Sequence, residues 1–69
     1  MLKTKLESLV EEMISKGIRF QEARQELEKR FIAQVLEREH GNLSRAAKVL
    51  RIHRNTLSKK IAQYKVRQR

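Results

Sequence analysis

Lys and Arg are the side chains of this chain whose types and spacing point to chemistry, because in the C-terminal part no acidic side chain accompanies them. Residues 40–69 carry nine Lys or Arg and no acidic side chain, whereas residues 1–39 carry eight basic and eight acidic ones. The C-terminal part therefore holds the whole formal net charge of +9. A cationic field of this kind attracts polyanions, of which nucleic acid is the commonest.

Residue types that carry catalysis or bind metal are sparse. His40 and His53 are separated by 13 positions, and the chain has neither Cys nor Asp, so the spacing of a metal site is absent. There is also no Gly-rich phosphate loop and no pattern of a nucleophile with an orienting base. We expect a binding protein and not an enzyme, with no cofactor, no metal and no small-molecule ligand.

The length and composition predict one small all-α domain. The chain has 69 residues, no Pro and only two Gly, and it is rich in good helix formers. A core of this size contributes only about 3–5 kcal/mol, and without Cys the missing stability must come from a partner chain. No apolar run resembles a signal peptide or a membrane span. We expect a cytoplasmic, self-associating protein.

Apolar residues recur at helical spacing through the first 41 residues and predict two helices. One ends near Gly17, and the other runs from about Gln21 to His40 and ends at Gly41. Each helix carries an apolar stripe that a second chain can cover, and the first stripe has the spacing of a coiled-coil seam. We therefore expect residues 1–41 to form a dimerisation region. The residues expected at the interface are Leu6, Leu9, Val10, Met13, Leu27, Phe31 and Val35.

A second apolar face is expected on the same long helix. Ile32 and Leu36 lie beside the stripe that contains Phe31 and Val35, so the apolar arc widens toward the C-terminal half of this helix. A helix with more than one apolar face has two neighbours to contact.

Two short helical patterns follow the second glycine. The first covers Arg45–Leu50 and has either Ser44 or Asn42 as its N-cap. The second starts near Arg54 after a turn of about three residues. Two short helices joined in this way predict a helix-turn-helix within residues 42–69.

The last helix has a buried side spaced i, i+4, i+7 at Leu57, Ile61 and Tyr64. We expect Tyr64 at the edge of the core with its hydroxyl in water. Asn55 and Lys59 lie on the opposite side, together with Ser58 and Ala62.

Two segments of this region carry a more specific pattern. They read Gly-Asn-Leu-Ser-Arg-Ala-Ala from Gly41 and Ile-His-Arg-Asn-Thr-Leu from Ile52, followed by Lys59-Lys60. The pattern resembles the Fis-type helix-turn-helix, found in the bacterial nucleoid protein Fis and at the C-terminus of NtrC-type activators. The detailed match covers residues 41–64, and the upstream helices are similar to the pair through which that family dimerises. One departure is Arg51, at a turn position where the family commonly has Gly. Two conformations are open for it: a positive φ at some steric cost, or a first short helix that runs on by one residue.

The resemblance implies a DNA-binding surface. Arg54, at the start of the last helix, is expected to contact a guanine through both of its terminal nitrogens. For Asn42 and Ser44, helix capping and phosphate contact both remain open explanations. The full set of residues expected to contact DNA is Asn42, Ser44, Arg45, His53, Arg54, Asn55, Thr56, Lys59 and Lys60.

These patterns together favour sequence-influenced binding of double-stranded DNA by a homodimer, as a transcriptional regulator or a nucleoid-associated protein in the bacterial nucleoid. Three alternatives remain. A basic amphipathic module could bind an anionic membrane or an acidic protein, although the break between the short helices makes a membrane surface an unexpected partner. RNA binding is disfavoured by the few aromatic residues. The chain could also be the oligomerisation and DNA-binding tail of a larger NtrC-type activator.

Overall fold

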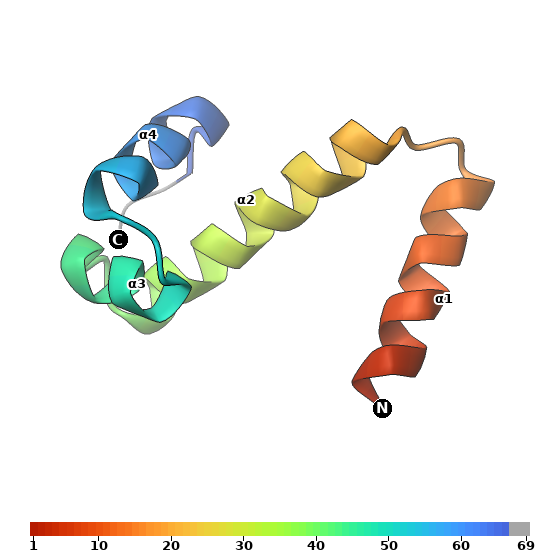
Figure 1. Ribbon diagram of the computed structural model, residues 1–69, viewed down its shortest axis with the longest axis horizontal. Coiled ribbons are helices and arrows are strands. Elements are labelled where there is room, and N and C mark those ends of the chain that lie inside the picture. Colours follow the sequence, from red (N-terminus) through yellow and green to blue (C-terminus); the bar gives the residue numbers. More distant parts are fainter. Residues whose placement is uncertain (67–69) are drawn as a thin grey trace.

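The computed structural model describes residues 1–66, which form four α-helices and no strand (Figure 1). The helices are α1 (Leu2–Ser15), α2 (Phe20–Arg38), α3 (Leu43–Leu50) and α4 (Arg54–Tyr64). The all-α prediction is confirmed. The last three positions of the predicted 42–69 region lie outside the described residues.

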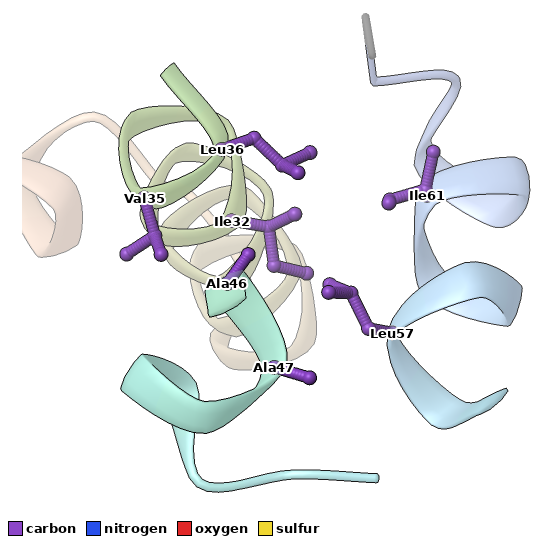
Figure 2. Close-up of a cluster of buried hydrophobic side chains, with 7 residues drawn as sticks. All are labelled: Ile32, Val35, Leu36, Ala46, Ala47, Leu57 and Ile61. Atoms are coloured by element: carbon purple, nitrogen blue, oxygen red, sulfur yellow. The ribbon is translucent and has the colours of Figure 1, made fainter. Parts of the chain in front are cut away.

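The core lies where α3 and α4 pack against the C-terminal half of α2. Ala46 is 0 % exposed, and its small side chain and that of Ala47 bring the α3 backbone close to α2 (Figure 2). Leu57 of α4 enters from the other side, and burying a side chain of this size contributes about 1.5–3 kcal/mol. The buried residues are Ile32, Val35, Leu36, Ala46, Ala47, Leu57 and Ile61.

The second apolar face predicted for α2 is confirmed, because Ile32 and Leu36 are fully buried in this core. Val35 behaves differently from what the sequence suggested. We expected it on the dimer stripe, but it is only 9 % exposed and belongs to the core of its own chain. Val35 belongs to the same buried cluster as Ile32, Leu36 and Ala46, so little of its surface remains for a second chain.

Helix α1 contributes nothing to this core. It lies beyond the N-terminal end of α2, apart from α3 and α4 (Figure 1), and none of its residues is buried. Leu6, Leu9 and Val10 are exposed, while Met13 is half-buried. Helix α2 also carries exposed apolar side chains, among them Leu27 and Phe31. Helices α1 and α2 therefore both carry an exposed apolar face that the rest of the described chain does not cover.

Each described helix ends with a residue in the left-handed conformation. At the end of α3, the Arg51 N–H donates to the Lys48 carbonyl at 3.2 Å and the Ile52 N–H donates to the Ala47 carbonyl at 3.1 Å, which is a Schellman motif. The departure noted at Arg51 is thus accommodated by a positive φ of 58°, and α3 does not continue through it. The residues with positive φ at the four helix ends are Gly17, His40 with Gly41, Arg51 and Lys65.

The ends of α2 differ from the predicted ones by one or two residues. Phe20 was expected in the connection, but it starts the helix because the Glu22 carboxylate accepts the Arg19 backbone N–H at 3.1 Å. This hydrogen bond lowers the pKa of Glu22. His40 was expected inside the helix, but its φ of 54° places it beyond the last turn.

Arg51→Gly should stabilise the protein by about 0.5–1 kcal/mol, because glycine takes a positive φ without the steric cost that a Cβ brings. Arg51→Ala is the control, since it removes the same guanidinium but keeps the Cβ. Denaturant unfolding at one protein concentration measures both. Equal stability of the two variants would show that the charge, and not the backbone, sets the effect.

Candidate nucleic-acid interface

The side chain of Asn42 fixes the start of the helix-turn-helix. Its Oδ1 accepts the Arg45 backbone N–H at 3.0 Å, so Asn42 is the N-cap of α3. The alternative with Ser44 as the cap is wrong, because Ser44 already lies inside the first turn of α3. Ser44 is exposed there.

A short connection then turns the chain into α4. His53 has extended backbone angles and is the N-cap residue of α4, although its side chain makes no capping hydrogen bond. Ile52 packs against the core and holds this connection in place. Arg54 is therefore the first residue of α4, as the sequence predicted, and its side chain is exposed.

Helix α4 separates an apolar side from a polar one. Leu57 and Ile61 are buried, while Asn55, Thr56 and Lys59 are exposed. Ser58 and Ala62 share this exposed side, as the helical spacing predicted. The outer side of α4 is therefore open along its whole length and carries small, amide and cationic side chains. Of the nine residues predicted to contact DNA, all except Lys60 are exposed.

Two of the nine residues form ion pairs with α2 or the residue after it. Arg45 Nε lies 3.4 Å from Glu39 Oε1, but the Arg45 side chain remains 74 % exposed. A pair this open contributes about 0.2–1 kcal/mol. The guanidinium can therefore exchange the carboxylate for another anion at little cost.

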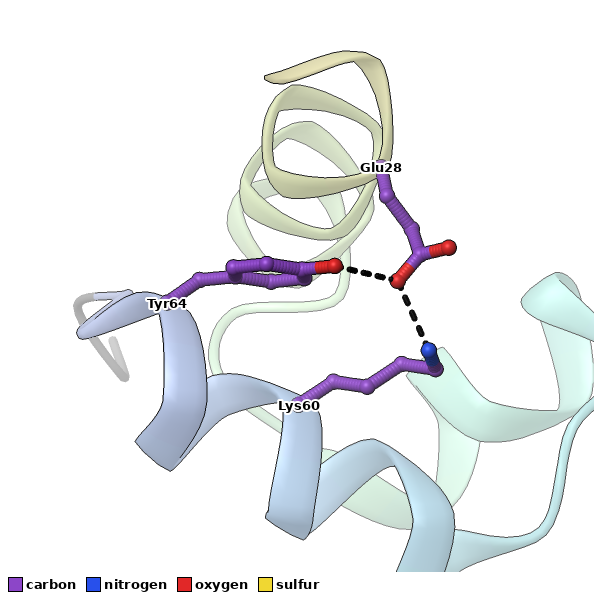
Figure 3. A network of polar contacts seen from close by, with 3 residues as sticks. All are labelled: Glu28, Lys60 and Tyr64. Atoms are coloured by element: carbon purple, nitrogen blue, oxygen red, sulfur yellow. Dashed lines mark hydrogen bonds and ion pairs between the residues drawn. The ribbon is translucent and has the colours of Figure 1, made fainter. Parts of the chain in front are cut away.

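Lys60 has a much closer partner. Its Nζ lies 2.7 Å from Glu28 Oε1, and both side chains are half-buried (Figure 3). The hydroxyl of Tyr64 donates to the same Glu28 oxygen, also at 2.7 Å. The expectation that this hydroxyl points into water is wrong. Glu28 lies one helical turn before Ile32 on α2, and this position facing the core is the sequence signal that could have indicated its role.

The two contacts shift the pKa values of both acidic groups. The hydrogen bonds from Lys60 and from Tyr64 hold the pKa of Glu28 below its ordinary value, because they stabilise the carboxylate. The hydrogen bond to Glu28 raises the pKa of the Tyr64 phenol, because ionisation would remove the donated proton and place two negative charges together.

Charge on the helix-turn-helix is thus partly neutralised and partly free. Glu28 pairs with Lys60 and Glu39 pairs with Arg45, whereas Arg54 and Lys59 have no ion-pair partner among the described residues. The open side of α4 therefore carries the cations that remain available to a polyanion.

Within residues 1–66, no three His or Glu side chains come close enough together to hold a metal ion. The helices of the same range are also too short or too polar to cross a membrane.

The model of a family described as bacterial regulatory protein, Fis family, matches residues 23–64. The matched range covers most of α2 and all of α3 and α4, which is more than half of the chain. Comparisons with curated proteins and with solved structures gave no significant match.

Asn42→Ala should destabilise the protein by about 1 kcal/mol, because it leaves the Arg45 N–H without its acceptor. Ser44→Ala, two residues later, should change the stability by less than about 0.5 kcal/mol. Thermal or denaturant unfolding of the two variants gives the comparison. If Ser44→Ala is the more destabilising change, Asn42 is not the cap that holds α3.

Proposed function

Because the chain belongs to the Fis family of bacterial regulatory proteins, its helix-turn-helix is a DNA-binding element, and we propose that it binds duplex DNA as a homodimer. In this proposal α4 is the recognition helix and enters the major groove, while α3 lies across the phosphate backbone behind it. The role is binding and not catalysis, in transcriptional regulation or in the organisation of the bacterial nucleoid.

The observation that carries the proposal is the open outer side of α4. Its N-terminal turn presents Arg54, Asn55 and Thr56 to the exterior, and Lys59 follows one turn later. Recognition helices contact base edges with residues of their N-terminal part, so Arg54 is the proposed base contact, bidentate to a guanine.

The remaining proposed contacts are to phosphate or to neighbouring base edges. Asn42, Ser44 and Arg45 lie at the N-terminus of α3, where the helix dipole favours an anion. His53 lies at the entry to α4. These contacts would position the protein on the duplex, whereas Arg54 would supply sequence preference.

The apolar face of α1 and α2 supports the homodimer. Large apolar side chains on α1 and α2 are exposed in the single chain; the Phe31 side chain, for example, is 60 % exposed. Only seven side chains are buried among the described residues, which is a small core for an independent domain. A second copy packed on this face would bury these side chains. The proposed interface residues are Leu6, Leu9, Val10, Met13, Leu27 and Phe31.

A two-fold dimer of this kind reads two half-sites on one face of the duplex. Straight B-DNA presents successive major grooves about 34–36 Å apart. Where the two recognition helices are closer than this, the duplex must bend, and site choice then depends partly on how easily each sequence deforms.

Selection from a randomised pool of duplex DNA at near-physiological salt, with the full chain, tests the function directly. Enrichment of a two-fold symmetric motif is the expected result, and the length of its spacer reports the separation of the recognition helices. Enrichment of flexible or A/T-rich tracts alone would indicate that the protein reads DNA shape. Retention of no duplex above background would contradict the proposal.

Arg54→Ala should weaken binding to the selected duplex by about 1–3 kcal/mol and relax the preference at one position of each half-site. Arg54→Lys is the matched variant, because it keeps the charge but not the bidentate geometry. It should lose the same preference with little change in the dependence of affinity on salt. Competition assays against duplexes substituted at each position measure both. Uniform weakening across all sequences would exclude Arg54 as a base contact.

Phe31→Glu should convert the dimer into a monomer, because it places a charge on each side of the proposed two-fold interface. Val49→Glu is the control, since Val49 is exposed to a similar extent, 56 %, but lies on α3, away from this face. Sedimentation equilibrium measures the mass of both variants and of the unsubstituted chain. Dissociation of both variants alike, or of neither, would place the interface elsewhere.

A further inference from the structure

The contact of Glu28 with Lys60 and Tyr64 joins α2, the proposed dimerisation helix, to α4, the proposed recognition helix. Glu28 belongs to α2, next to Leu27 on the exposed apolar face, while Lys60 and Tyr64 are one helical turn apart on α4 (Figure 3). A single carboxylate oxygen accepts both hydrogen bonds, each 2.7 Å long. One acceptor with two short bonds from positions one turn apart on the same helix restrains how that helix lies on α2.

These three residues lie beside the apolar core, and Tyr64 packs against it. The buried Ile61 lies between Lys60 and Tyr64 in the sequence of α4, and the buried Ile32 lies one turn after Glu28 on α2. The hydrophobic effect that stabilises these apolar contacts is not directional. The charge-assisted hydrogen bonds are directional, and they lie at the half-buried edge of the interface, where water competes less than at an open surface.

We propose that Glu28, Lys60 and Tyr64 are positioning residues that hold the recognition helix α4 at a fixed orientation on the dimerisation helix α2. Lys60 acts through Glu28 and not by contact with a phosphate, although it stands beside Lys59, which is free to make such a contact. The inference rests on the proposed function, since it gives the cluster a task in the dimer. Any rotation of α4 on α2 would change the distance between the two recognition helices.

The adjacent lysines provide the first test. If Lys60 stays with Glu28 in the complex, Lys60→Met leaves the slope of log affinity against log salt unchanged, because no counterion is released at that residue. Lys59→Met is the matched control and should reduce the slope by about one. A reduction of the same size for Lys60→Met would overturn the proposal.

The substitution Glu28→Gln distinguishes a positioning role from a purely electrostatic one by its effect on the ratio of affinities for two duplexes. If charge alone matters, removing a negative charge should strengthen binding to every duplex alike. Glu37→Gln is the control, because Glu37 is exposed on the same helix and its substitution should change the charge alone. With a positioning role, Glu28→Gln also lowers the ratio of affinities for the selected duplex and for a scrambled duplex by about three- to tenfold. Tyr64→Phe, which removes one hydroxyl without changing the ring, should lower the same ratio.

Titration of the phenol tests the contact without any DNA. Tyr64 is the single tyrosine of the chain, so ultraviolet difference spectroscopy reports its ionisation alone. The hydrogen bond to Glu28 raises the pKa of Tyr64, and Glu28→Gln should return this pKa toward its ordinary value. A pKa of Tyr64 that does not respond to Glu28→Gln would overturn the proposal at its foundation.

The two levels of the proposal fail in different ways. If the pKa of Tyr64 responds but the affinity ratio stays constant in all the variants, the cluster serves only the fold, and the positioning role is wrong. If the unsubstituted chain binds no duplex, the proposed function fails and takes the positioning role with it, while the titration still establishes the contact.

Discussion

The burial of Ile32 and Leu36 of α2 against α3 and α4 is the interaction on which the rest of this structure depends. It is the only place among residues 1–66 where apolar side chains from three helices are fully removed from water. The two alanines of α3 permit the close approach, and Leu57 completes the contact from α4. Without this core Ile52 would lose the apolar contacts that anchor the turn, and α4 would lose the contacts of Leu57 and Ile61 that keep its other side open.

Helix α2 therefore has two apolar faces, one that packs against α3 and α4 and one that is open to a second chain. Its C-terminal half packs inside its own chain, whereas Leu27 and Phe31 lie on a face that the same chain leaves open. Glu28 lies where these two regions meet and bonds to α4. One continuous helix thus connects the proposed dimer interface to the helix-turn-helix, and a rigid helix transmits orientation over its length.

Much of the fold and part of the site followed from the sequence. Helical spacing and the two glycines located all four helices to within a few residues, because apolar periodicity is a local property of the chain. The same spacing indicated which side of α4 stays open. The N-cap was ambiguous, since Asn42 and Ser44 are both good caps, and only the hydrogen bond from Arg45 decided between them. For Arg51 two conformations were open, a left-handed residue or one more helical residue, and only the backbone of the folded chain decided between them.

By itself, the sequence determined the helical class, the helix-turn-helix and the concentration of positive charge in the last thirty residues. These depend on residue type and on spacing over a few turns. The tertiary structure alone decided that Val35 faces its own core, that the Tyr64 hydroxyl bonds to Glu28, and that Lys60, unlike Lys59, has an ion-pair partner among residues 1–66. The physical reason is that such contacts join residues of different helices, as far apart in the chain as Glu28 and Tyr64, and the partners depend on how the helices cross.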